Sequence, residues 1–230
     1  MCGRFVSSSP PQALADFFGA AFDGEPLRES FNVAPTNDVY GVVANADGAV
    51  LQPFQWGLVP SWAKDVKIGS KMINARAETI LEKPSFKGLV VKHRLIIPMD
   101  GFYEWQQQAD PASRQPKTPT FIHRVDGTPL AVAGLWARWR DRDAGDDAPW
   151  LHTCTVITTA ANGTMAPVHN RMPVILPASA WAEWLDPTNR DVAALHELMM
   201  PAADDVLEMH AVSTAVNNVR NKGAELIDPA

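Results

Sequence analysis

Short apolar runs separated by turn residues fill most of the chain. The pairs Asp47-Gly48 and Asp126-Gly127 are typical of hairpin turns, because these residue types accept the backbone angles of a tight turn. Many short strands joined by such turns predict a β-rich sandwich or barrel. The predicted strands are 39–44, 49–55, 94–99, 102–106, 120–125, 130–139, 151–158 and 173–176.

Helical segments are fewer. Ser9 and two prolines precede apolar residues at helical spacing in 12–18, and Gly19 follows them, which predicts one short helix. Further helices are predicted at 75–81, 178–185 and 190–199. Surface loops are predicted at 107–119, which is rich in Gln, Pro and Ser, and at 141–149, which is acidic.

These elements sum to an α+β fold with a mostly antiparallel sheet and short flanking helices. The 230 residues are 46% hydrophobic and 20% charged, as in folded globular proteins. No repeat or linker divides the chain, so we expect a single domain over residues 1–230. The longest apolar run, 130–136, is far shorter than the roughly 18 residues of a membrane span. With no secretory signal, the two cysteines should be free thiols in the cytoplasm.

Charge is unevenly distributed along the chain. Residues 60–100 carry eight cations and four acids, a balance of +4, which leaves −10 for the rest of a chain of net charge −6. One narrow face could therefore bind phosphates, although a solvated lysine-rich surface is the simpler interpretation. The cations are Lys64, Lys67, Lys71, Arg76, Lys83, Lys87, Lys92 and Arg94. Trp56 and Trp62 precede this segment, and aromatic side chains beside cations suit single-stranded nucleic acid, although Trp56 fits a core position.

Cys2 carries the most distinctive chemistry. Initiator methionine is generally removed before a small residue, so Cys2 would become the N-terminus and present an α-amine beside a thiol. Such an amine is partly neutral and nucleophilic near pH 7. It condenses with an aldehyde to an imine, and the thiol then closes a five-membered thiazolidine. It could alternatively attack an amide as an N-terminal nucleophile, or simply be a cysteine that follows the start codon.

Three further segments offer polar groups with two interpretations each. Asn74 could cap the helix predicted after it, or orient a carbonyl or the N-terminal amine. Glu104 lies among aromatic residues in a strand, where it could transfer protons or serve as a structural hydrogen-bond partner; Trp105 should face the opposite way. His169 and Arg171 could form an acid/base and phosphate-binding pair, or a structural contact.

The remaining cysteine and histidines have structural interpretations. Cys154 lies in an apolar, alternating run and is expected to be a small buried side chain. No Cys-x-x-Cys spacing or nearby histidine pair implies a zinc site. The other histidines are His93, His123, His152, His196 and His210.

Six ordered segments resemble the SOS response-associated peptidase (SRAP) family, the abasic-site processing proteins. They read MCGRF at 1–5, NVAPT at 32–36, WGLVP at 56–60, NARAET at 74–79, GFYEW at 101–105 and HNRMP at 169–173. The resemblance covers the chain from Cys2 to about Val219. It departs from the pattern at Asn170, where many members have Asp, and in the two predicted loops, which are longer than the minimal pattern.

The resemblance implies a β-barrel-like core, a positively charged DNA channel, and covalent capture of abasic sites in single-stranded DNA through Cys2. Asn74 would orient the Cys2 amine, Glu104 would assist sugar opening and ring closure, and His169 would assist imine chemistry and reversal. The residues implied to contact DNA are Arg4, Arg76, Trp105, Thr158 and Arg171.

Three functional hypotheses follow from these observations. The first is a thiazolidine crosslink at abasic sites, with weak lyase activity from any imine that stays open. The second is an N-terminal-nucleophile cysteine peptidase that removes its own Met1. The third is a reversible reader of single-stranded DNA. No cofactor, metal or membrane is implied, and we expect a cytoplasmic monomer that associates with the nucleoid when bound to DNA.

Overall fold

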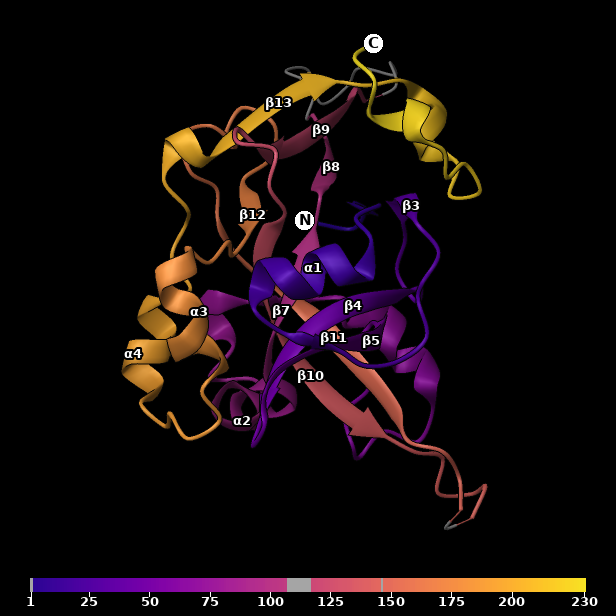
Figure 1. Cartoon of the computed structure of the whole chain (residues 1–230), viewed down its shortest axis with the longest axis vertical. Coiled ribbons are helices and arrows are strands. Elements are labelled where there is room, and N and C mark those ends of the chain that lie inside the picture. The colour runs from indigo at the N-terminus through magenta and orange to yellow at the C-terminus, as the bar shows by residue number, and fades with distance from the viewer. Residues whose placement is uncertain (1, 107–116, 146) are drawn as a thin grey trace.

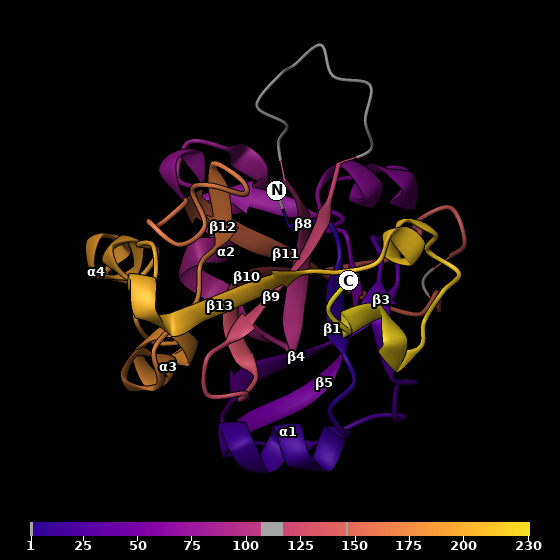
Figure 2. The same cartoon turned by 90° about the horizontal axis from the view of Figure 1, so that it is seen from above.

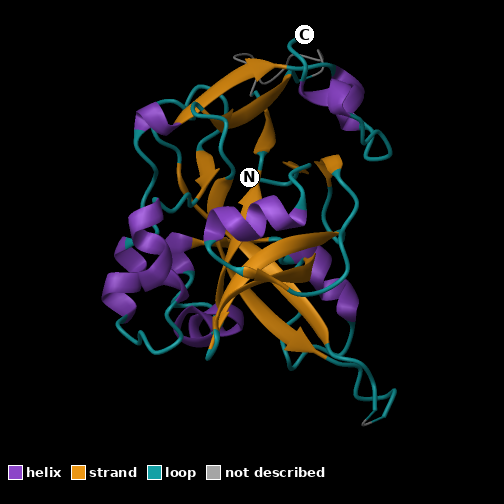
Figure 3. Ribbon diagram, in the orientation of Figure 1, coloured by secondary structure: helices purple, strands orange, loops and turns teal. Residues whose placement is uncertain are grey.

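Strands occupy the centre of the molecule and helices lie at its periphery (Figures 1 and 3). The computed structural model describes residues 2–106, 117–145 and 147–230. The strands are β1 Phe5–Ser7, β2 Ala21–Phe22, β3 Ser30–Val33, β4 Asp38–Asn45, β5 Gly48–Trp56, β6 Asn74–Arg76, β7 Arg94–Met99, β8 Gly101–Trp105, β9 Pro119–Arg124, β10 Leu130–Trp139, β11 Leu151–Ala160, β12 Arg171–Pro173 and β13 Leu207–Ala211.

Four α-helices and five short 3₁₀ helices surround the strands in the described residues. The α-helices are α1 Pro11–Phe18, α2 Pro84–Lys92, α3 Ala178–Leu185 and α4 Val192–Glu197. The 3₁₀ helices are η1 Val66–Lys71, η2 Ala77–Thr79, η3 Asp204–Val206, η4 Thr214–Asn217 and η5 Ala224–Ile227. No helix among the described residues is long and apolar enough to span a membrane.

The strands form two sheets. One has the order β13-β9-β8-β1-β3, and the other has the order β12-β11-β10-β7-β4-β5-β2. In the second sheet β5 also pairs with β11, so β11, β10, β7, β4 and β5 form a closed ring of hydrogen-bonded neighbours. Most pairings are antiparallel, whereas β11 pairs in parallel with β5 and β6, and β2 with β5. The predicted α+β fold is confirmed, with a ring-like sheet in place of a regular barrel.

The ring has a buried cluster on each face, which explains the apolar run of β7. Ile96 packs with Leu135 and Trp184 in the cluster beneath the helices. Its neighbour Ile97 faces the other way and packs in the cluster that contains Cys2 and Trp56. A strand covered on both faces needs apolar residues at every position. Cys2, the first residue that the structure describes, thus lies inside the core.

The first helix follows the predicted signals closely. Proline occupies its first turn, and Gly19 ends it with a φ of 61°, donating its N–H to the carbonyls of Ala15 and Asp16. The helix buries Leu14, Ala15 and Phe18, and it lies beside β4 and β5 in both views (Figures 1 and 2).

One of the two predicted hairpins is confirmed and the other is wrong. The strands β4 and β5 pair from Val39↔Phe54 to Asn45↔Gly48, as the Asp47-Gly48 signal predicted. At Asp126-Gly127 the chain does turn, with the Gly127 N–H bonded to the Arg124 carbonyl. However, β9 pairs with β8 and β13, while β10 pairs with β7 and β11. This turn carries the chain from one sheet to the other, which a local turn signal cannot distinguish from a hairpin.

Two further predictions need correction. Residues 75–81 are not a helix: the segment is the end of β6 followed by η2, because its backbone pairs with β11. The predicted strand 173–176 is displaced, since β12 ends at Pro173 and only an isolated bridge joins Ile175 to Val132. The helix α2 was missed, and Gly88 in its middle weakens the helical signal.

The other predicted segments have mixed outcomes. The helix at 178–185 is confirmed as α3, whereas the helix at 190–199 shortens to 192–197. Of the two predicted loops, 141–149 is an exposed run of turns around the undescribed residue 146. Residues 107–116 of the other loop lie outside the described residues.

The backbones of Gly57 and Gly69 are in close contact in the segment before β6. A Cβ at Gly57 would lie 2.7 Å from the Gly69 carbonyl oxygen, and Gly57 has a φ of 127°. Gly48 has a similar φ of 129° but open space around it. We expect Gly48→Ala to cost about 1–3 kcal/mol of unfolding free energy from backbone strain. Gly57→Ala should cost at least about 1 kcal/mol more, because the backbone must also move. Urea unfolding of both variants measures the difference, and equal losses would contradict the steric argument.

Candidate functional site around Cys2

Cys2 lies at the entry to β1 and is fully buried. The Tyr103 N–H donates to the Arg4 carbonyl at 2.9 Å, so the β1–β8 pairing at Phe5↔Phe102 continues toward the N-terminus. This register brings the start of the chain alongside Glu104. Burial raises the pKa of the Cys2 thiol, and the Glu104 carboxylate adds to the shift. The thiol is therefore protonated at neutral pH.

Asn74 holds the backbone of Cys2. Its Nδ2 donates to the Cys2 carbonyl oxygen at 2.8 Å. The parallel pairing of β6 with β11, at Asn74↔Val156, places it there, so the alternative helix-capping role is wrong. The Oδ1 of Asn74 is buried and accepts no hydrogen bond from the described part of the chain. A buried amide oxygen beside the N-terminus is suited to accept a hydrogen bond from an amine.

Glu104 and Trp105 face opposite sides of β8, as their strand positions predicted. Glu104 is 5% exposed, and its charge acts on the Cys2 thiol. Trp105 packs with Tyr103 in a separate cluster, and its Nε1 donates to the Asn217 Oδ1 at 2.7 Å. The structure therefore brings the carboxylate, and not the indole, toward Cys2.

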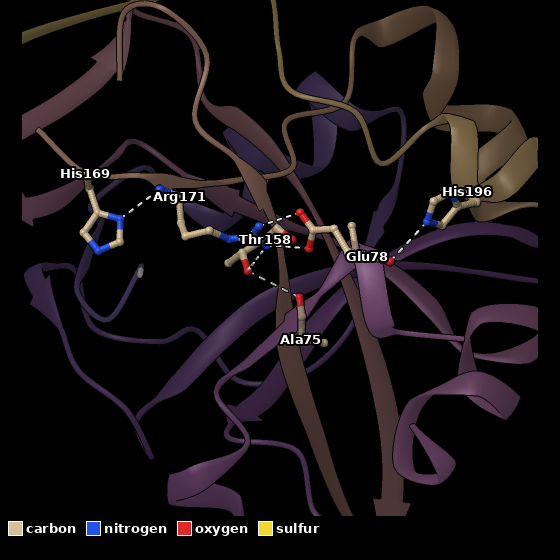
Figure 4. A network of polar contacts seen from close by, with 7 residues as sticks. Ala75, Glu78, Thr158, His169, Arg171 and His196 are labelled. Carbon is tan, nitrogen blue, oxygen red and sulfur yellow. Dashed lines mark hydrogen bonds and ion pairs between the residues drawn. The ribbon is translucent and has the colours of Figure 1, made fainter. Parts of the chain in front are cut away.

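His169 lies just before β12, and Figure 4 shows its contact with Arg171. The Arg171 backbone N–H donates to His169 Nδ1 at 2.9 Å. Because Nδ1 accepts this bond, the neutral ring carries its proton on Nε2. Burial lowers the pKa of His169, and the charge of Glu104 opposes the shift. At neutral pH the ring is thus a neutral hydrogen-bond donor through Nε2.

The guanidinium of Arg171 is held by Glu78 and Thr158 (Figure 4). Nη1 and Nη2 donate to the two Glu78 carboxylate oxygens at 2.5 and 2.9 Å, and Nη2 also reaches the Thr158 carbonyl at 2.7 Å. Thr158 is fully buried, and its hydroxyl lies 3.5 Å from the Ala75 carbonyl. Any effect of the Thr158 side chain on a ligand therefore passes through its neighbours. Glu78 was missed, although it lies in the same short motif as Asn74.

Arg4 is anchored by a second asparagine, Asn32. Its Nη1 donates to Asn32 Oδ1 at 2.8 Å and to the Val216 carbonyl at 2.9 Å. Asn32 is fully buried, and its Nδ2 lies within bonding distance of the carbonyls of Val216, Asn218 and Asn221. The guanidinium also lies 5.7 Å from the Trp105 ring. Asn32 therefore ties the C-terminal segment to the beginning of the chain, a role that sequence reasoning missed.

The cations of residues 60–100 lie on the surface, as predicted, except for Arg94. Arg94 is 5% exposed and donates to the carbonyls of Trp184 and Val90, so it cannot meet a phosphate. The other seven cations of residues 60–100, including Arg76, are exposed. These seven cations lie with three exposed acids, Asp65, Glu78 and Glu82, whereas Arg94 is in the core and Asp100 is half-buried.

The remaining features of the described residues concern metal binding, a surface hollow and two buried core residues. Among the described residues, no three His, Cys, Asp or Glu side chains are arranged to bind a metal ion. A hollow of about 830 Å³ lies beside α1 and α3, lined by Phe17, Trp181 and Met200 among others, and by none of the candidate site residues. As predicted, Cys154 and Trp56 are fully buried in the core.

Comparison with known proteins identifies the family of this chain. The sequence model of the family described as SOS response associated peptidase (SRAP) matches residues 1–219. The abasic site processing protein YoaM of Bacillus subtilis is 40% identical over 230 residues, which cover 99% of this chain and 98% of the relative. YedK of Escherichia coli, another abasic site processing protein, is 32% identical over the full length of both chains.

A more distant relative and a solved structure are also similar to this chain. The abasic site processing protein HMCES of Gallus gallus is 34% identical over 81% of this chain and 59% of the relative. A crystal structure of a Bacteroides thetaiotaomicron protein superposes with a TM-score of 0.86 at 26% identity, covering all of both chains. The family model and the shared fold thus define a SRAP-type protein. This chain belongs to the SRAP family.

The Glu78–Arg171 pair yields a pH-dependent prediction. The hydrogen bond from Arg171 lowers the pKa of Glu78 in the folded protein. The pair therefore stabilises the fold above the unfolded-state glutamate pKa of about 4.3, and this contribution is lost as the pH falls through the lower folded value. We expect Glu78→Gln to lower stability at pH 7 by up to about 1 kcal/mol, since the pair is partly exposed. Urea unfolding between pH 7 and pH 3.5 should show the gap to wild type closing at the acidic end. A gap that stays constant would contradict the argument.

Proposed function

We propose that this protein recognises abasic sites in single-stranded DNA and bonds to them through Cys2 after Met1 is removed. Membership of the family and the relatives' names support DNA with abasic sites as the partner. The observation that carries the proposal is the buried Oδ1 of Asn74, which accepts no hydrogen bond from the described residues, because the same side chain already holds the Cys2 carbonyl. Once Met1 is removed, Asn74 Oδ1 would accept a hydrogen bond from the new α-amine of Cys2.

The reaction needs no oxidant or cofactor. The ring-opened sugar of an abasic site presents an aldehyde at C1′, which the Cys2 amine attacks to form a carbinolamine. Loss of one water gives an imine. The thiol sulfur then adds to the imine carbon, and the thiol proton passes to the nitrogen, which closes the thiazolidine. The balance is one water released for one crosslink.

The site chemistry favours this order of steps. The raised pKa of the Cys2 thiol keeps sulfur protonated, so the amine is the better first nucleophile. Asn74 Oδ1 orients the amine by accepting its N–H. Glu104 exchanges protons during sugar opening and ring closure, and the neutral His169 donates from Nε2 to the departing oxygen. An imine left open permits β-elimination, which gives a weak lyase activity.

Arginines supply the phosphate contacts for the single-stranded DNA. Arg76 is exposed and follows Asn74 by two residues on β6. Arg171 binds Glu78 in the free protein, and a phosphate would compete with that carboxylate. Arg4 and Trp105 flank the other side of β8, and Thr158 supports Arg171. We propose that a single-stranded segment crosses these groups, bound by one protein monomer.

A gel assay with an abasic oligonucleotide tests the crosslink. Without borohydride, wild type should form a conjugate that survives denaturation, and Cys2→Ala, which keeps the α-amine but lacks the sulfur, should form none. Cys2→Ser keeps the amine but lacks the sulfur, so we expect a conjugate only after borohydride reduction of the imine. Cys154→Ala is the matched control and should behave as wild type, because Cys154 lies inside β11 and has no free α-amine beside its thiol.

The same assay separates the competing hypotheses. Wild type that forms no conjugate would overturn the crosslinking proposal. Salt-sensitive binding to intact single-stranded DNA that survives Cys2→Ala, without any conjugate, would favour a reversible reader.

A second candidate function is an N-terminal-nucleophile peptidase that removes its own Met1. The charge of Glu104 at the Cys2 thiol is the contact such chemistry would use. The protonated thiol argues against it, so we expect Glu104→Ala and His169→Ala to lose Met1 normally through a cellular aminopeptidase. Intact-protein mass spectrometry of both variants measures this, and retained Met1 would favour self-processing.

A further inference from the structure

The loop 161–170 that carries His169 is fastened to a segment far along the chain. At its start, Asn162 Nδ2 donates to the carbonyls of Ala202 and Ala203 at 3.0 and 3.2 Å. The Gly163 N–H donates to Asp204 Oδ1 at 2.6 Å, and this is a charge-assisted bond. The Thr164 hydroxyl donates to the Asp204 carbonyl at 2.6 Å. Four contacts thus hold the first turn of the loop against residues 202–204.

Hydrogen bonds inside the loop connect this attachment to His169. The Met165 N–H donates to Asn162 Oδ1 at 2.9 Å. The His169 N–H in turn donates to the Met165 carbonyl at 3.0 Å. Met165 is fully buried in the same cluster as Cys2. The position of the imidazole therefore depends on how the first turn of the loop is seated.

Gly163 allows the close approach of Asp204. A Cβ at Gly163 would lie 2.6 Å from Asp204 Oδ2. A residue with a Cβ at 163 would force the Asp204 carboxylate or the loop to shift. Asp205 provides a control for Asp204. It is also exposed, and its side chain makes no hydrogen bond with the described residues.

We propose that Asp204 is a positioning residue, which holds the loop 161–170 so that His169 faces Cys2 and Glu104. It acts through the Gly163 N–H and does not touch the reacting atoms. The proposal rests on the proposed function for the effect on crosslinking. Its structural part, the placement of the His169 ring, can be measured without DNA.

Nitrogen-15 NMR of the histidine rings is the first measurement. In wild type, His169 should show the neutral form with its proton on Nε2, because Nδ1 accepts the Arg171 N–H. We expect Asp204→Ala to move the His169 signals toward the averaged tautomers of an exposed ring. Asp204→Asn keeps an oxygen acceptor for the Gly163 N–H and should restore the wild-type signals. Asp205→Ala should leave them unchanged.

The rate of conjugate formation is the second measurement. Misplacing a group by about 1 Å can cost up to about 100-fold in rate, and we expect Asp204→Ala to slow the reaction by about tenfold. Asp204→Asn and Asp205→Ala should remain near wild type. In a His169→Ala background, Asp204→Ala should add nothing further, because both changes remove the same group from the site.

These results distinguish the two proposals. If wild type forms no conjugate, the proposed function fails, while the NMR signals still test the positioning role. If wild type reacts but Asp204→Ala matches Asp205→Ala in rate and in His169 signals, the positioning role is overturned. Should Asp204→Ala unfold, Gly163→Ala tests the same contact from the other side, and unchanged His169 signals there would also overturn the proposal.

Discussion

The register of β11 is the constraint on which the site depends. This strand pairs with β6 so that Asn74 lies opposite Val156, and with β12 so that Arg171 lies opposite Ala160. Because side chains alternate along a strand, a slip by one residue would turn Asn74 away from Cys2. The same pairing closes the ring through β5. Pairing with β11 thus fixes the relative positions of β5, β6 and β12, which are far from it in sequence or from one another.

Two asparagines, the buried Asn32 and the half-buried Asn74, extend this arrangement to the two ends of the chain. Asn32 joins Arg4 to the C-terminal segment, and Asn74 joins the Cys2 carbonyl to β6. Buried amides without partners are costly, so each fully bonded asparagine fixes the segments that it connects. The partly bonded Asn74 is the exception. Its Oδ1 is buried and accepts no hydrogen bond from the described residues.

Local signals predicted the elements whose bonds are local. The helix α1 has its proline and glycine at the expected ends, and the β4–β5 turn contains its own hairpin signal. The failures share a physical cause. Residues 75–81 resemble a helix, yet β6 is made by pairing with a distant strand, and Asp126-Gly127 marks a turn without revealing that β9 and β10 join different sheets.

The sequence by itself determined the family and predicted the chemistry of Cys2 and the residue types of the candidate site, because motif content and covalent chemistry are properties of the chain. Only the tertiary structure decided which groups meet. It buries Arg94 in the core, pairs Glu78 with Arg171, and seats the His169 loop on residues 202–204. Those outcomes come from hydrogen bonds and burial between residues far apart in sequence, which no local pattern encodes.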